Sequence, residues 1–209
     1  MNEITNREVE RYIYDLLPPR DVVLRKMEAE AAKRAIPIIG PAVARVLYLL
    51  ATATGAKRVF EMGSAIGYST LWLARAVGER GEVFYTDGNP KNAKEAEGYF
   101  KRAGVSKRIH VMVGNALDLL QQVRGDFDII FNDVDKYWYP DVFKVAVPRV
   151  RKGGLFITDN VLWSGRVARS RPDLSTRKIQ EFNRLIYSST RLFTTILPIR
   201  DGVAVCRKL

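Results

Sequence analysis

The sequence predicts an α/β protein with an open, doubly wound parallel sheet that carries helices on both faces. From Gly55 onward, short apolar runs alternate with helical stretches, as expected when crossover helices connect parallel strands. This alternation breaks near the C-terminus, where a short turn joins two strand-like runs and predicts an antiparallel hairpin at one sheet edge. We therefore expect a mostly parallel, seven-stranded sheet.

A helical extension is predicted to precede this sheet. Thr5 and Glu8 have the spacing of a capping box before an amphipathic first helix. A second helix is expected from Asp21 into the 28–34 region. Pro41 suits the first position of a third helix, and Gly55 suits the C-cap that ends it.

The core elements follow from the alternation of apolar and helical segments. The five parallel strands are expected at 58–62, 82–87, 108–113, 127–133 and 155–159. The helices between them are expected at 69–77, 90–103, 116–123 and 139–150, with Asn89 and Pro90 as an N-cap and N1 pair. A helix at 176–188 precedes the hairpin strands at 192–197 and 203–207.

Length and composition suit one domain over residues 1–209, with 1–55 as the helical extension and 56–209 as the core. The chain has 209 residues, 47% of them hydrophobic, which is enough for a sizeable core. A single cysteine excludes an internal disulfide framework, and the longest apolar stretch, 41–56, is too short to span a bilayer. The N-terminus is polar, so we expect a soluble cytoplasmic protein without a membrane partner.

The net charge of +11 at pH 7 favours anionic partners through long-range attraction. A solvated basic surface without such a partner explains the charge equally well, because charge alone does not define a site.

The loop after the first predicted strand has the features of a nucleoside site. Gly63 and Gly67 let the backbone turn sharply and approach a ligand. Their spacing differs from the dinucleotide fingerprint, which excludes a pyrophosphate cradle of that type. S-adenosylmethionine (SAM) would suit the loop, because Asp87 can accept from ribose hydroxyls and Ser69 can donate to a carboxylate. The alternative is a turn whose glycines serve only the backbone.

Acidic residues follow the fourth and fifth predicted strands. If these strands lie side by side, their ends bring Asp133, Asp159 and Asn160 together. Two carboxylates and an amide oxygen are ligands that suit Mg²⁺, Mn²⁺ or Ca²⁺, and three protein ligands leave room for an acceptor. The alternative is that these residues are ordinary loop and turn residues.

Lys136 follows the first of these acids closely and can act as a general base beside a cation. His110 lies within an apolar run, so we expect a packed strand residue there. One histidine and one cysteine exclude a zinc site and a histidine-based catalytic triad.

These residues resemble the cation-dependent class I O-methyltransferases, the family that includes catechol and caffeoyl-CoA O-methyltransferases. The likeness runs from about residue 37 to the C-terminus. The matching segments are EMGSAIGYS at 61–69, FNDVDK at 131–136, GGLFITDNVLWSG at 153–165 and LPIRDGVAVCRKL at 197–209.

The resemblance implies a Rossmann-like fold, a SAM cofactor, a divalent cation, with Mg²⁺ first, and a homodimer. The implied cofactor residues are Ile39, Glu61, Gly63, Ser64, Ser69, Asp87, Ala116 and Asp133. The implied cation ligands are Asp133, Asp159 and Asn160, and the implied catalytic residues are Lys136 and Asp133. The implied acceptor residues are Asp135, Lys136, Trp163 and Ser164.

Three departures from the family pattern concern cofactor contacts and leave the cation ligands in place. They are Asn132 before the acid, Asn115 near the adenine, and Asp-Gly-Asn-Pro at 87–90.

Three functions remain open from the sequence. The leading one is methylation of a hydroxyl on a catechol-type or hydroxycinnamoyl-type small molecule. The second is O-methylation of a hydroxylated uridine in tRNA, favoured by the basic loop Arg166, Arg169 and Arg171. The third is a non-catalytic SAM-binding protein. Tyr12 and Tyr14 are expected to be exposed and to supply a dimer surface.

Overall fold

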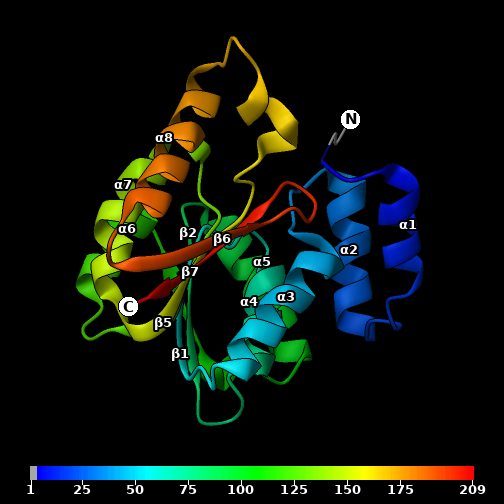
Figure 1. The fold of residues 1–209 in the computed structure, drawn as a ribbon. Helices are drawn as coiled ribbons and strands as arrows, with labels where there is room; N and C mark the ends of the chain where they lie inside the picture. Colours follow the sequence, from blue (N-terminus) through cyan, green and yellow to red (C-terminus); the bar gives the residue numbers. More distant parts are fainter. Residues whose placement is uncertain (1–3) are drawn as a thin grey trace.

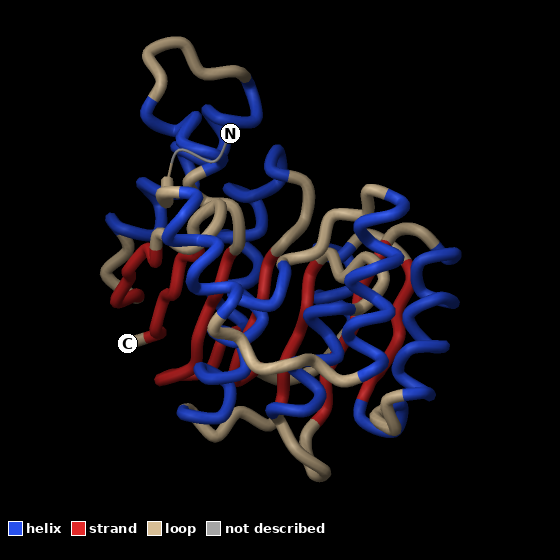
Figure 2. The backbone as a smooth tube through the Cα atoms, turned by 90° about the vertical axis from the view of Figure 1, so that its right-hand side faces the viewer, coloured by secondary structure: helices blue, strands red, loops and turns tan. Residues whose placement is uncertain are grey.

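The computed structural model describes residues 4–209, which form a seven-stranded sheet in the order β3-β2-β1-β4-β5-β7-β6. Strands β1 to β5 are parallel, and β7 pairs antiparallel with both β5 and β6. Figure 2 shows these strands side by side. The strands are β1 (Arg58–Met62), β2 (Glu82–Asp87), β3 (Ile109–Val113), β4 (Phe127–Asn132), β5 (Val150–Thr158), β6 (Leu192–Leu197) and β7 (Val203–Lys208).

Helices cover the sheet on both faces (Figure 1), as predicted. One core cluster joins α2, α3, α4 and α5 to one face, and a second joins α6, α7 and α8 to the other. The helices are α1 (Arg7–Asp15), α2 (Val22–Arg34), α3 (Gly40–Ala53), α4 (Tyr68–Ala76), α5 (Pro90–Arg102), α6 (Ala116–Gln122), α7 (Tyr139–Ala146) and α8 (Leu174–Ser188).

The central strands are buried along nearly their whole length, because both of their faces are covered. In β1, Val59 contributes to one core cluster and the next residue, Phe60, contributes to the other. This alternation is the two-residue period of a strand, and burial on both faces explains the continuous apolar runs in the sequence.

The predicted fold class is confirmed, including the adjacency of the fourth and fifth strands and the C-terminal hairpin. The fifth strand begins at Val150, several residues earlier than predicted. Asn89 caps α5 as expected, accepting from Lys91 N at 2.9 Å.

The predicted first capping box is wrong. Asn6 is the N-cap of α1, and its side chain accepts from the backbone N–H groups of Glu8 and Val9. The Thr5 hydroxyl instead donates to the carbonyl of Pro198, at 3.2 Å. Pro41 is the second residue of α3, which begins at Gly40.

The predicted exposure of Tyr14 and the predicted packing of His110 are both wrong. Tyr12 on α1 is 63% exposed, but Tyr14 is half-buried and lines the cleft described below. His110 belongs to a strand but is exposed, where it stacks on Phe84 and contacts Glu82 at 2.9 Å.

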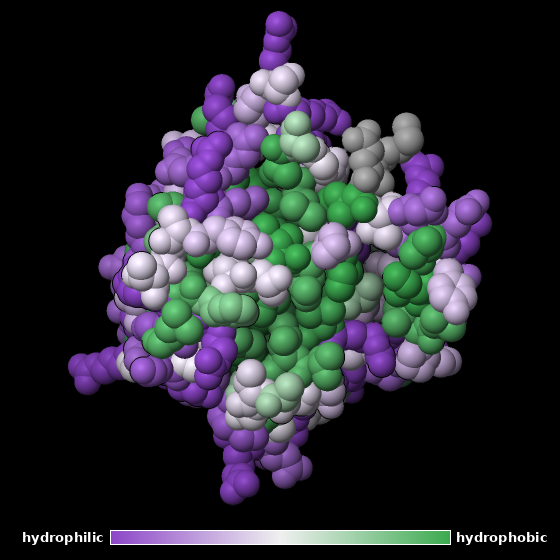
Figure 3. Space-filling view, viewed as in Figure 1, coloured by the Kyte–Doolittle hydropathy of each residue, from purple (hydrophilic) through white to green (hydrophobic). Residues whose placement is uncertain are grey.

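Apolar side chains remain exposed along α1 (Figure 3, right-hand side). They are Val9, Tyr12, Ile13 and Leu16. In the part of the chain from residue 4 onward, no helix has the length and apolar character needed to cross a bilayer.

Candidate active site

A cleft of about 1470 Å³ lies at the carboxyl edge of the parallel strands, where loops after β1, β2, β3, β4 and β5 meet. The helical extension closes its other side through α2 and the connection to α3, so core and extension both contribute walls. Ligands of doubly wound sheets bind at this edge.

The loop after β1 forms the floor of this cleft. Gly63 has φ +83°, and a Cβ atom there would lie 2.7 Å from the backbone oxygen of Asp133. Gly67 also has φ +83°, and a Cβ atom there would lie 2.5 Å from the ring of Phe100. Both glycines are therefore needed for backbone conformation and for close packing.

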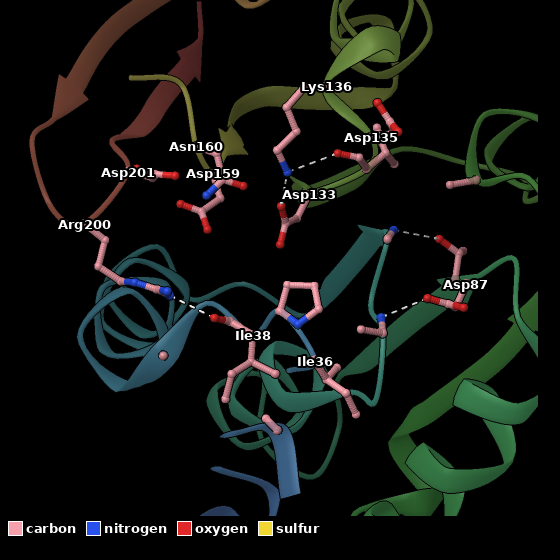
Figure 4. Close-up of a pocket in the computed structure, with 18 of the residues that line it drawn as sticks. Ile36, Ile38, Asp87, Asp133, Asp135, Lys136, Asp159, Asn160, Arg200 and Asp201 are labelled. Carbon is pink, nitrogen blue, oxygen red and sulfur yellow. Dashed lines mark hydrogen bonds and ion pairs between the residues drawn. The ribbon is translucent and has the colours of Figure 1, made fainter. Parts of the chain in front are cut away.

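Asp87 lies at the end of β2 and lines the cleft. Its carboxylate accepts from Ala65 N at 3.0 Å, from Asn89 N at 2.7 Å and from Asn92 Nδ2 at 3.1 Å. These contacts fix the carboxylate beside the glycine loop, and Figure 4 shows its position at the cleft. Ala116, the first residue of α6, also lines the cleft.

Four of the predicted cofactor residues, Ile39, Glu61, Ser64 and Ser69, are buried and are not among the described residues that line the cleft. Burial raises the pKa of Glu61 to about 7, although hydrogen bonds from Ser69, Thr70 and Ser64 oppose the shift. Within residues 4–209, Glu61 Oε1 has no hydrogen-bond partner.

Asp133 and Asp159 follow β4 and β5 at the same level, because Asn132 and Thr158 are partners in the sheet register. Their carboxylates point into the same space (Figure 4). Burial, followed by repulsion from Asp133, raises the pKa of Asp159 to about 7. Burial also raises the pKa of Asp133, against the opposing effect of Lys136.

Asn160 lines the cleft beside these acids and has φ +57°. Asp159 Oδ1 is buried and lacks a hydrogen-bond partner in the described chain. The described residues contain no group of three histidine, cysteine, aspartate or glutamate side chains suited to a metal. The predicted cation ligands are not a group of that kind, because they are two carboxylates and one amide.

Lys136 contacts one member of the acid pair, Asp133, directly. Its Nζ donates to Asp133 Oδ1 at 3.0 Å and to Val134 O at 3.3 Å. The ammonium lies 5.6 Å from the ring centre of Tyr139 and 5.7 Å from that of Trp163. Only 15% of the lysine side chain is exposed, so packing holds it at the cleft.

The three other predicted acceptor residues occupy different environments. Asp135 and Trp163 line the cleft, and Asp135 also accepts from Tyr137 N at 3.0 Å. Ser164 is not among the described lining residues. It donates from its hydroxyl to Asp201 Oδ1 at 2.9 Å.

The sequence patterns do not identify several charged or polar residues that line the cleft, among them Tyr14, Arg200 and Asp201. Arg200 and Asp201 lie in the turn between β6 and β7. Because β6 runs in the same direction as β5, the turn that follows β6 lies at the carboxyl edge with the other loops. The direction of β6 is therefore the signal that could have placed Arg200 and Asp201 at the cleft.

The fold and the cleft define a Rossmann-like α/β protein with a ligand site at the carboxyl edge of its sheet. A model of the O-methyltransferase family matches residues 20–209. The chain is 33% identical to a catechol O-methyltransferase of Niastella koreensis over 217 residues, covering 98% of each protein. It is 33% identical to caffeoyl-CoA O-methyltransferase 1 of Eucalyptus globulus, covering 78% of this chain and 71% of that one.

Among solved structures, an O-methyltransferase from Bacillus cereus in complex with SAH (S-adenosylhomocysteine) matches with a TM-score of 0.87. It is 32% identical, and the match covers 97% of each chain. The chain therefore belongs to the O-methyltransferase family. It is a SAM-dependent O-methyltransferase.

Proposed function

We propose that this enzyme transfers the methyl group of SAM to one hydroxyl of a catechol-type or hydroxycinnamoyl-type small molecule, with the help of a divalent cation. The observation that carries the proposal is the buried, unpartnered Asp159 Oδ1, in the part of the chain described, beside a second carboxylate and an amide. The buried Asp159 and the partly buried Asp133 repel each other when both are ionised, and a cation would remove that repulsion.

The proposed cation ligands are Asp133, Asp159 and Asn160. All three line the cleft, and hard oxygen ligands of this kind suit Mg²⁺ before zinc. When bound, the cation would acidify an acceptor hydroxyl and hold two adjacent oxygens, while SAM would supply the electrophilic methyl group.

The proposed general base is Lys136. Its Nζ lies 3.0 Å from Asp133 Oδ1, beside the position where the acceptor hydroxyl would lose its proton, and as the neutral amine it would take up that proton. The rings of Tyr139 and Trp163 restrict its movement. Most of the remaining rate enhancement would come from alignment of the acceptor oxygen with the methyl group.

The proposed cofactor residues include the glycine loop after β1 and Asp87 at the end of β2. Asp87 is held by three donors, and the open side of its carboxylate at the cleft suits the ribose hydroxyls. Glu61 has an unpartnered buried oxygen within the described residues, which suits the ammonium group of the methionine moiety. Gly63, Ser64, Ser69, Ala116, Ile39 and Asp133 complete the proposed set.

Aromatic side chains support a planar acceptor. Trp138 and Trp163 line the cleft close to the proposed cation ligands, and Arg166 lies 4.8 Å from the ring centre of Trp163. The named relatives are a catechol and a caffeoyl-CoA O-methyltransferase, and both names describe aromatic diols. Asp135, Trp163 and Ser164 are the proposed acceptor residues, together with Lys136.

The tRNA acceptor lacks a specific supporting observation in the cleft. Arg166 is close to Asp173, at 3.9 Å, so this loop has an acidic neighbour as well as its basic residues. A homodimer and a cytoplasmic location remain predictions. The exposed apolar side chains of α1 are the surface that we propose for the dimer.

An acceptor panel tests the proposal. The protein with Mg²⁺ and SAM would be offered catechol, caffeate, caffeoyl-CoA, the monophenol p-coumarate, and tRNA carrying 5-hydroxyuridine. We expect methylation of at least one diol and none of p-coumarate, because one oxygen cannot be chelated in the same way. Methylation of the tRNA alone, or of p-coumarate as fast as the diols, would contradict the proposal.

A further inference from the structure

The turn between β6 and β7 contacts both flanks of the cleft. Arg200 Nη1 donates to the carbonyl of Ile38, in the connection between α2 and α3, at 2.9 Å. The next residue, Asp201, accepts from Ser164 N at 2.8 Å and from Ser164 Oγ at 2.9 Å. Figure 4 shows Arg200 reaching toward Ile38 of the helical extension. The neighbouring Asp201 contacts residues 161–165, the segment called here the Trp163 loop.

Arg200 adopts a backbone conformation that favours glycine. Its φ is +49°, in the left-handed region that costs energy for a residue with a side chain. Strain of this kind persists where the surrounding structure holds it, and it is concentrated at functional sites. A glycine would form the turn more easily, but it would not provide the guanidinium group in the cleft.

The helical extension has a complementary position at Gly40. This residue has φ +69°, and a Cβ atom there would lie 3.2 Å from Arg200 Nη1 and 3.2 Å from the hydroxyl of Tyr14. The missing side chain therefore lets the guanidinium and the phenol reach the backbone of the extension. Thr5 adds a second link, since its hydroxyl donates to Pro198 O in the same turn.

On the other side of the cleft, the segment that carries Trp163 is attached to the β6–β7 turn by backbone hydrogen bonds. Val161 N donates to Gly202 O at 3.0 Å, and Leu162 N donates to Asp201 O at 2.8 Å. Together with the two bonds from Ser164, these contacts hold the segment that carries Trp163 in the cleft.

We propose that Arg200 is a positioning residue for SAM, because it holds the connection between α2 and α3 against the cleft. Together, Arg200 and Asp201 couple this connection to the Trp163 loop. Ile36, Pro37 and Ile38 of the connection line the cleft opposite the acids, so their position sets the space left for the cofactor. The effect on the acceptor side rests on the proposed function, whereas the effect on the cofactor does not.

Binding of SAH, without acceptor or cation, tests the first part by calorimetry. Arg200→Gly should weaken binding roughly tenfold, as expected for loss of a charged hydrogen bond. The melting temperature of the free protein should change little, because relief of the positive φ opposes the loss of the bond to Ile38 and the added freedom of the unfolded chain. Arg200→Lys keeps the charge and a donor, and should restore part of the affinity.

The matched control is Arg207→Ala, which removes one positive charge from an exposed position on β7. It should bind SAH like the unchanged protein. An Arg200→Gly affinity within twofold of the unchanged protein would overturn the proposal. An Arg200→Lys affinity no better than that of Arg200→Gly would also overturn it. In turnover, the KM for SAM should rise while kcat at saturating SAM changes less than about twofold, a separation that misfolding would not produce.

Hydrogen exchange tests the coupling. In the unchanged protein, SAH should slow amide exchange in residues 36–40 and also in residues 161–165. In Arg200→Gly, saturating SAH should no longer slow exchange in 161–165, and equal protection in both proteins would refute the coupling. Because SAH calorimetry and hydrogen exchange use no acceptor, failure to methylate diols would leave both of these results interpretable, whereas complete absence of SAH binding would reject the cofactor site itself.

Discussion

Lys136 Nζ lies 3.0 Å from Asp133 Oδ1, and the two residues come from the same short segment after β4. A lysine held on a partly buried carboxylate between two aromatic rings has few alternative positions. This pairing connects the proposed cation site to the proposed base.

Replacing Lys136 with methionine should lower kcat by a factor of about 10² to 10³, within the range for loss of a general base. SAH affinity should stay within about threefold, since the side chain is proposed to act on the acceptor. Lys144→Met is the matched control, because Lys144 pairs with Asp141 in the same i, i+3 spacing but is 65% exposed. Full activity in Lys136→Met would exclude the lysine as the base.

The affinity for Mg²⁺ should rise with pH between about 6 and 8. Burial and the neighbouring Asp133 raise the pKa of Asp159 to about 7, so this carboxyl carries a proton in much of the protein at pH 6. A cation must displace that proton, and the proton is released on binding. Calorimetry in buffers of different ionisation enthalpy measures the release. A pH-independent affinity with no proton release would argue against Asp159 as a ligand.

Glu61 should make the folded protein less stable as pH rises. Its pKa is raised by burial to about 7, above the ordinary 4.5, so the folded state holds a proton that the unfolded state releases first. The stabilisation is complete below pH 4.5 and is lost as pH rises toward 7. Relative to Glu61→Gln, the unchanged protein should lose roughly 3 kcal/mol of unfolding free energy between pH 4.5 and pH 8.

Urea unfolding of both proteins across this pH range measures that difference. The glutamine has the same shape and keeps hydrogen-bonding atoms for Thr70, so packing is conserved. Parallel stability curves for the two proteins would show that Glu61 does not hold a proton in the folded state.

Gly63→Ala should destabilise the protein and weaken SAH binding. The new Cβ atom would meet the backbone oxygen of Asp133 at 2.7 Å, so overpacking of about 1–3 kcal/mol adds to a positive-φ cost of about 1 kcal/mol. Gly104→Ala is the control, because its φ is +71° and nothing lies within 4 Å of its Cβ position. Equal unfolding free energies for the two variants would contradict the close approach of Gly63 to Asp133.

The acid pair was predictable because it depends on strand order alone. The alternation of apolar and helical segments predicts β4 and β5. Because these strands are adjacent, the residues that follow them, Asp133 and Asp159, lie at the same edge. Arg200 was not predictable in the same way. Its role depends on packing between the β6–β7 turn and a carbonyl 162 residues earlier in the chain, and no local pattern encodes that contact.

The N-cap of α1 could not be predicted from the local sequence either. Thr5 and Asn6 are neighbours that can both cap a helix, and the choice depends on which backbone adopts the cap conformation. A contact from Thr5 to Pro198 engages the threonine hydroxyl, and this contact is distant in sequence. The burial of Glu61 in β1 could not be predicted either, because the motif does not show that neighbouring elements cover its carboxylate.

Methyl transfer from SAM to catechol, measured with Mg²⁺ and with excess EDTA for the unchanged protein and for Asp159→Ala, tests the role of the cation and of Asp159 together. We expect transfer that requires Mg²⁺ and falls by at least about 10²-fold in the variant, since the cation would both acidify and orient the acceptor. SAH binding by the variant would confirm that it remains folded. Transfer that persists in EDTA, or an Asp159→Ala variant as active as the unchanged protein, would show that methylation does not depend on a cation held by Asp159.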